Sequence, residues 1–88
     1  MTYASFLKKS IDEADLSLGQ ICRRLKQKGI NLDRTTLSKL QNGKMSPAKD
    51  HVNIALAEVL GVNGEKLRLA AIKEIIPPDL YSLISKVG

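Results

Sequence analysis

Positive charge is concentrated in one stretch of this 88-residue chain. Residues 16–49 contain eight lysines and arginines and a single carboxylate, Asp33, whereas the whole chain has a net charge of +5. The remaining residues are therefore slightly acidic. Such a local excess of positive charge is typical of a surface that binds the phosphate groups of a nucleic acid. A solvated basic surface without a ligand is the alternative at this point.

Few side chains in the sequence could perform catalysis or bind a metal. The chain has one histidine, His51, and one cysteine, Cys22. A nucleophile that needs a histidine base has a single candidate partner, and a four-ligand zinc site would have to use carboxylates for most of its ligands. We therefore expect no enzyme activity, no metal and no cofactor.

The same composition bears on where the protein acts. A lone cysteine cannot form an internal disulfide, which is typical of proteins from a reducing compartment. The sequence has no apolar run of about 20 residues, and the charges at its N-terminus are not in the order of a secretory signal. We expect a cytoplasmic protein associated with the nucleoid, with no membrane partner.

Hydrophobic spacing and capping residues predict short helices along most of the chain. Ser17 and Gln20 have the spacing of a capping box, and Asp33 and Asn63 stand at two further helix starts. Ser46 and the proline after it predict the start of the fourth helix. The expected helices are residues 3–14, 17–28, 33–42, 46–61 and 63–76. The fourth should turn Val52, Ala55, Leu56, Val59 and Leu60 inward; the fifth should have Leu67, Ala70, Ala71 and Ile75 on one face and Leu69, Ile72 and Ile76 on another.

No stretch alternates with period two for long enough to form a strand, so the predicted fold class is all-α. We expect a compact bundle of five or six short helices. Residues 1–76 should form one domain. Residues 77–88 should form a short helical tail in which Asp79 caps a brief segment with an apolar face. The members of that face are Leu80, Leu83, Ile84 and Val87.

Two segments of the sequence resemble a known family of DNA-binding proteins. Residues 16–25 (LSLGQICRRL) and 32–61 are similar to the Cro/repressor-type, or Xre, helix-turn-helix family of bacteria and their phages. The most specific part is residues 34–44 (RTTLSKLQNGK), which resembles the family's recognition helix and the turn after it. The resemblance implies a lambda-repressor-like fold that binds double-stranded DNA. Leu18 stands where the family usually has glutamine, and the link between the two helices is longer than the family's usual turn.

The predicted third helix and the resemblance indicate the same candidate site. The N-terminal residues of such a helix enter the major groove first, so Arg34 could pair with guanine and its exposed neighbours could contact base edges or phosphates. The start of the second helix, at Ser17, offers backbone N–H groups to another phosphate, and Gln20 could take the role of the family's glutamine. The predicted DNA-binding residues are Ser17, Gln20, Arg34, Thr35, Thr36, Ser38, Lys39, Asn42 and Lys44.

We therefore expect a sequence-specific transcriptional regulator, most simply a repressor. An alternative of a different class is an antirepressor or antitoxin-like module that uses the same fold to bind another protein. A third is a non-specific nucleoid binder. The second apolar face of the helix at 63–76 favours a protein contact, because one small core cannot cover both faces. The expected partners are double-stranded DNA, a second copy of the chain bound through residues 65–87 and, on the alternative, a regulatory protein.

Overall fold

The computed structural model describes residues 2–76, and within them it contains five helices and no strand. The helices are α1 (Tyr3–Ala14), α2 (Leu18–Gln27), α3 (Arg34–Gln41), α4 (Asp50–Leu60) and α5 (Gly64–Ile75). The predicted all-α class is therefore confirmed. The predicted tail, with the segment that Asp79 would cap, lies outside the described residues. Within residues 2–76, none of the helices has the length and hydropathy that a membrane-spanning helix needs.

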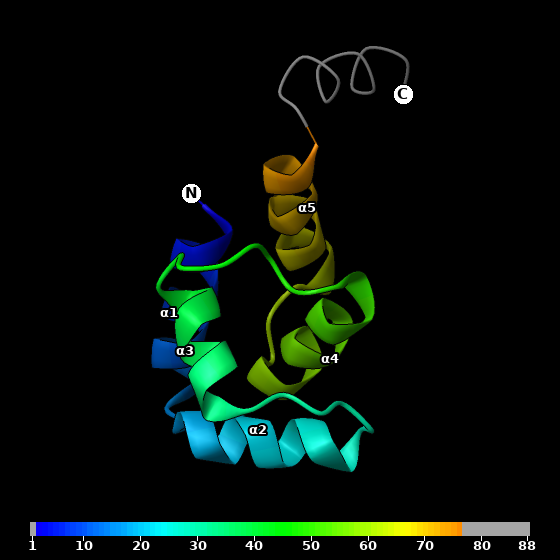
Figure 1. Ribbon diagram of the computed structural model, residues 1–88. Helices are drawn as coiled ribbons and strands as arrows, with labels where there is room; N and C mark the ends of the chain where they lie inside the picture. Colours follow the sequence, from blue (N-terminus) through cyan, green and yellow to red (C-terminus); the bar gives the residue numbers. More distant parts are fainter. Residues whose placement is uncertain (1, 77–88) are drawn as a thin grey trace.

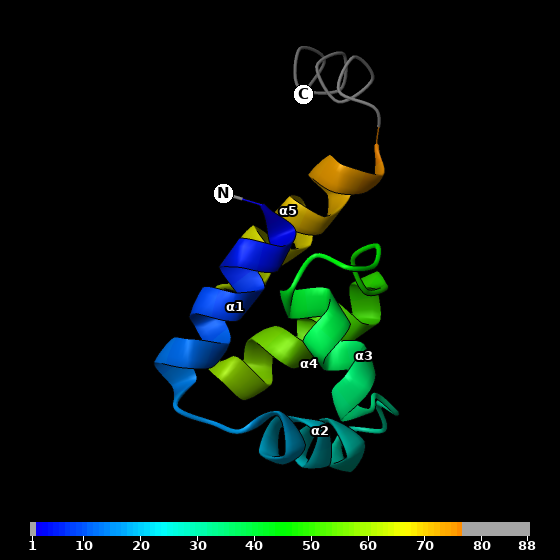
Figure 2. The same ribbon diagram turned by 60° about the vertical axis from the view of Figure 1, so that its left-hand side comes forward.

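The helices surround one core, with α2 at one end of the molecule and α5 extending toward the other (Figure 1). Helix α4 packs along α5, and α1 contacts α3, α4 and α5. Helix α2 closes the bundle against α3 and α4 (Figure 2). All five helices contribute buried apolar side chains, so none of them is an appendage. The largest of these are Tyr3, Leu7, Ile11, Ile21, Leu25, Leu37, Leu40, Leu56, Leu60 and Leu67.

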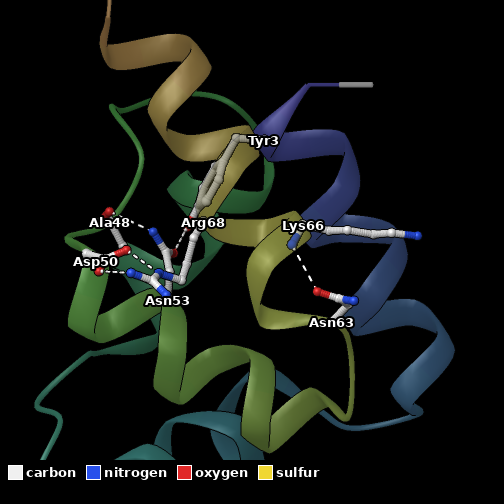
Figure 3. A network of polar contacts seen from close by, with 7 residues as sticks. All are labelled: Tyr3, Ala48, Asp50, Asn53, Asn63, Lys66 and Arg68. Atoms are coloured by element: carbon white, nitrogen blue, oxygen red, sulfur yellow. Dashed lines mark hydrogen bonds and ion pairs between the residues drawn. The ribbon is translucent and has the colours of Figure 1, made fainter. Parts of the chain in front are cut away.

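Three of the predicted helix starts are confirmed by the hydrogen bonds of their capping residues. The Ser17 hydroxyl accepts the Gln20 N–H at 3.1 Å, and the Gln20 side-chain oxygen accepts the Ser17 N–H at 2.9 Å. The Asp33 carboxylate accepts the N–H of Thr36 at 2.7 Å. In the same way, the side-chain oxygen of Asn63 accepts the N–H of Lys66 at 3.1 Å (Figure 3). Each cap binds a group only three residues away, which is why the sequence pattern predicts it.

The predicted start of α4 at Ser46 is wrong. The helix begins at Asp50, with Lys49 as an N-cap that makes no side-chain hydrogen bond. The cause is Asn53, which is completely buried and donates its side-chain N–H to the carbonyl oxygen of Ala48 at 2.9 Å (Figure 3). That carbonyl is therefore not used for a helical bond, and the first backbone bonds of α4 go to the carbonyl of Lys49 instead. The chain from Ser46 to Lys49 stays outside the helix.

The inward faces of α4 and α5 also differ from the prediction at several positions. Val52 and Val59 are half-buried, whereas the unpredicted Asn53 and Ala57 are buried. Ile75 shares a predicted face with Leu67 and Ala71, which are buried, but it is itself 62% exposed. It lies in the last turn of α5, which extends past the ends of α1 and α4 (Figures 1 and 2), so no other described helix covers it. Ile75 therefore joins Leu69 and Ile72 as an exposed apolar residue of α5.

We expect Tyr3→Phe to destabilise the fold in a pH-dependent way. The Tyr3 hydroxyl donates to the Asn53 side-chain oxygen at 2.6 Å inside the core, and burial raises the pKa of Tyr3 to about 12. At neutral pH the variant leaves a buried oxygen without its donor, which should lower the free energy of unfolding by about 1–3 kcal/mol. Because the folded-state pKa of Tyr3 lies above its ordinary value of 10.0, its contribution is complete below pH 10 and is lost as the pH rises toward 12.

Urea unfolding of both proteins between pH 8 and pH 12 measures this effect. The stability difference between wild type and Tyr3→Phe should narrow above pH 10. A difference that stays constant across this range would show that folding does not raise the pKa of Tyr3 above its value in the unfolded chain.

Two glycines that flank the α4–α5 turn should respond in opposite directions to alanine. Gly61 ends α4 with φ at +70°, and a Cβ there would meet nothing within 4 Å. Gly61→Ala should therefore cost about 1–2 kcal/mol of folding stability through the backbone alone. Gly64 begins α5 at an ordinary helical φ, and its Cβ would make normal contact with Ala57 at 3.5 Å. Gly64→Ala should be neutral or stabilising by up to about 1 kcal/mol in the same unfolding assay.

Candidate functional site

An open groove of about 570 Å³ lies between the N-terminal end of α2 and the outward face of α3. Its lining consists of Ser17, Leu18, Gly19, Arg34, Thr35, Ser38, Lys39, Asn42 and Lys44. Seven of the nine residues predicted from sequence are in this lining. The structure thus brings together one helix start, one short helix and the turn that follows it.

The exposed face of α3 is available because this helix buries so little of itself. It has eight residues, of which only Leu37 and Leu40 are buried. Figure 2 shows α3 rising from α2, with its N-terminal end beside that helix. After α3, Gly43 takes a left-handed φ of +69° and turns the chain so that Lys44 lines the groove.

Gln20 and Thr36 are the two predicted residues that do not line the groove. The Gln20 side-chain oxygen is held by the capping box at the start of α2. Thr36 is half-buried beside Asp33, and hydrogen bonds from its backbone and side chain hold the pKa of Asp33 below its ordinary value. Asp33 is therefore ionised at neutral pH and serves to start α3. Gln20 and Thr36 therefore stabilise the N-terminal ends of α2 and α3, the two helices that form the groove.

Leu18 and Gly19 line the groove, although the sequence did not single them out for binding. A Cβ on Gly19 would lie 3.5 Å from Cδ of Arg34, so the aliphatic part of Arg34 passes over α2 at this glycine. The only sequence signal for these two positions is that they directly follow the N-cap Ser17. The approach of Arg34 to Gly19 joins residues 15 positions apart, and no local pattern predicts it.

The groove is positively charged and its cations are not neutralised within the described residues. Arg34, Lys39 and Lys44 line it, and no carboxylate does. Two ion pairs lie elsewhere on the surface: Lys28 with Glu58 at 2.7 Å, and Arg68 with Asp50 at 2.8 Å. The second of these joins α4 to α5 (Figure 3).

The polar groups of the groove can donate hydrogen bonds to an anion. Ser17, Thr35 and Ser38 supply hydroxyls, and the start of α2 supplies backbone N–H groups that lack helical partners. The side-chain N–H of Asn42 donates to the carbonyl oxygen of Ser38 at 2.8 Å. Cations and donors without a carboxylate suit an anion with many oxygen atoms.

The histidine and the cysteine, the side chains considered for catalysis, do not line this groove. His51 is exposed near the start of α4, and Cys22 is half-buried on α2. Burial, followed by the charge of Asp33, raises the pKa of the Cys22 thiol. Residues 2–76 contain no group of three or more histidine, cysteine, aspartate or glutamate side chains that could hold a metal ion.

Comparison with models of protein families, with curated proteins and with solved structures finds no match to this chain. The assignment of the groove therefore depends on its own geometry and chemistry.

Proposed function

We propose that the protein is a sequence-specific regulator of transcription, most simply a repressor, that binds double-stranded DNA in the cytoplasm through α2 and α3. The observation that carries the proposal is the groove, in which unpaired cations and hydrogen-bond donors surround the exposed face of a short helix. In this proposal α2 and α3 act as a helix-turn-helix pair. The resemblance of residues 16–25 and 32–61 to the Cro/repressor family supports the same function.

The dimensions and anchoring of α3 suit the major groove of DNA. An α-helix with its side chains is about 10–12 Å across, and the major groove of B-form DNA is about 12 Å wide. Leu37 and Leu40 hold one side of α3 in the core, so its opposite side can enter a groove without unfolding the bundle. The N-terminal end of α3 is the part that would meet the bases first.

The groove residues divide between base contacts and phosphate contacts. Arg34, the first residue of α3, can offer two parallel N–H groups to O6 and N7 of guanine. Thr35 and Ser38 can contact base edges or phosphates. Lys39, Lys44 and the N-terminal N–H groups of α2 would bind phosphates, which fix the register of the protein without reading sequence. Asn42 would join them by exchanging its bond to Ser38 for one to a phosphate.

A second copy of the chain is the partner that this function requires. One short recognition helix reads only a few base pairs, too few to select a site within a genome. The exposed apolar residues Leu69, Ile72 and Ile75 lie on α5, none of whose residues lines the groove. We propose that α5 forms a two-fold contact between two copies on DNA. The predicted contribution of residues 77–88 lies outside the described part of the chain.

The same apolar residues favour a second candidate function, an antirepressor or antitoxin-like module that binds another protein. The two functions differ in what the basic groove does. In a protein-interaction module the groove is not needed, and DNA affinity should not depend on Arg34. A non-specific nucleoid binder would bind DNA with no preferred sequence.

We expect Arg34→Ala and Lys44→Ala to affect DNA binding in different ways. Selection from random duplexes at near-physiological salt should enrich one motif for the wild type. On the best site Arg34→Ala should cost about 1–3 kcal/mol and relax the preference at one base position. Lys44→Ala should weaken binding to all duplexes about equally and reduce the salt slope by about 1.

Titrations of each variant against the selected duplex and a scrambled duplex measure these effects. Arg24→Ala, which removes a cation that does not line the groove, is the matched control. Equal weakening on both duplexes would assign Arg34 to phosphate, and unchanged affinity in both groove variants would exclude the groove as the DNA site. Circular dichroism confirms that each variant is folded.

The two-fold contact predicts the form of the selected motif. It should be an inverted repeat with half-site centres about 34–36 Å apart. Ile72→Glu places a charge on the exposed face of α5, where Ile72 is 39% exposed, and should reduce affinity for the full repeat far more than for one half-site. An asymmetric motif bound by one protein per duplex at all concentrations would contradict the dimer.

A further inference from the structure

A second groove, of about 340 Å³, meets the first one at Arg34. Gly19 and Arg34 line both grooves, so the contact between these residues is the place where the two are joined. The other lining residues of the second groove are Cys22, Arg23, Lys26, Ile30, Asn31, Leu32 and Asp33. None of these seven was predicted to bind a ligand.

The long link between α2 and α3 forms the far wall of the second groove. The N–H of Ile30 donates to the carbonyl of Leu25 at 2.9 Å, and the N–H of Gly29 donates to the carbonyl of Lys26 at 3.0 Å. This pair of bonds is a Schellman motif, which fixes the direction in which the chain leaves α2. Ile30 and Leu32 then pack against the core, and Asn31 between them is exposed. The wall is therefore held by backbone bonds and apolar packing.

The basic residues of α2 are divided between two sides of the helix. Arg23 and Lys26 line the second groove, beside the start of α3. Arg24 and Lys28 line a different hollow on the α4 side, where Lys28 forms its ion pair with Glu58. Arg23 and Lys26 form no ion pair with the described residues. They are exposed and face the same solvent region as Arg34.

The charge of the second groove is positive despite one carboxylate. Three cations line this groove. Its single acid, Asp33, accepts a hydrogen bond from the N–H of Thr36 at the start of α3. Its apolar lining consists of the half-buried Cys22, Ile30 and Leu32, which offer no N–H or oxygen in their side chains to a base edge. A flexible lysine and an arginine over such a surface suit a phosphate backbone better than a base pair.

We propose that the second groove binds the sugar-phosphate backbone of the same DNA duplex that the first groove contacts, through Arg23, Lys26 and Asn31. The inference rests on the proposed function and extends its contact surface from Lys44, past Arg34, to Lys26. Arg34 then stands between the base-reading surface and this second backbone contact. The long link is what makes the contact possible, because a tighter turn would leave no far wall.

Arg23→Ala and Arg24→Ala form a matched pair that tests this surface. The two residues are adjacent, carry the same charge and are both exposed, but they lie on different sides of α2. Binding of each variant to the selected duplex is measured over a range of salt concentrations. Loss of one phosphate contact in Arg23→Ala should reduce the magnitude of the salt slope by about 0.9 and weaken binding several-fold, with Arg24→Ala close to wild type. In the combined Arg23→Ala/Lys26→Ala variant, the magnitude of the salt slope should decrease by about twice as much.

Cys22 provides an independent readout, because it is the only cysteine of the chain and lines the second groove. Its reaction with iodoacetamide is followed by mass spectrometry at pH 8.5, with and without saturating duplex. DNA should slow the reaction several-fold in the wild type and in Arg24→Ala. In Arg23→Ala/Lys26→Ala, saturated at higher concentration, much of this protection should be lost even though the protein remains bound.

The outcomes separate this inference from the proposed function. Equal effects of Arg23→Ala and Arg24→Ala, or an unchanged Cys22 rate on saturation, would overturn the second contact while leaving DNA binding by the first groove intact. Absence of DNA binding by the wild type would overturn both. A selective loss in Arg23→Ala together with protection of Cys22 would establish the second groove as part of the DNA surface.

Discussion

The burial of two leucines on α3 is the constraint on which the rest of this structure depends. Eight residues are too few for a helix that is stable by itself in water, so α3 exists only because Leu37 and Leu40 are fixed in the core. Helices α1 and α2 supply much of their surroundings. Because two buried positions are enough, the remaining side chains of α3 are free to form a binding surface. Stability and the proposed function therefore use different sides of the same short helix.

The distribution of charge follows the same division. Carboxylates on α4 form ion pairs with Lys28 of α2 and Arg68 of α5, at positions that connect helices. Around the start of α3 the cations lie close together without such partners in the described residues. Their mutual repulsion is weak at the surface and is screened by salt. A polyanion would relieve this repulsion, so the same arrangement that contributes little to folding can contribute strongly to binding.

A buried polar contact sets the path of the chain between the groove and α4. Asn53 joins Tyr3 of α1 to the carbonyl of Ala48; the bond to Tyr3 is buried and the bond to Ala48 is partly buried (Figure 3). The contact holds the segment that follows Lys44, and with it one end of the groove, against the first helix. The same contact accompanies the start of α4 at Asp50 instead of near Ser46. A fully buried asparagine is acceptable because its side-chain oxygen and nitrogen both have partners.

Sequence patterns alone predict the all-α class, the five helices, three of their caps and seven of the nine candidate site residues, which line one groove. These features depend on contacts within one helical turn, such as that of Asp33 with Thr36, or on the helical periodicity of buried and exposed positions, as on α3. Helix packing sets the start of α4, the exposure of Ile75, the approach of Arg34 to Gly19 and the second groove beside it. Each of these features depends on contacts between residues that are distant in sequence, or on the point at which a helix extends beyond the helices that pack against it. Local hydrogen bonds and helical periodicity carry no information about such distances, and the packing of all five helices supplies it.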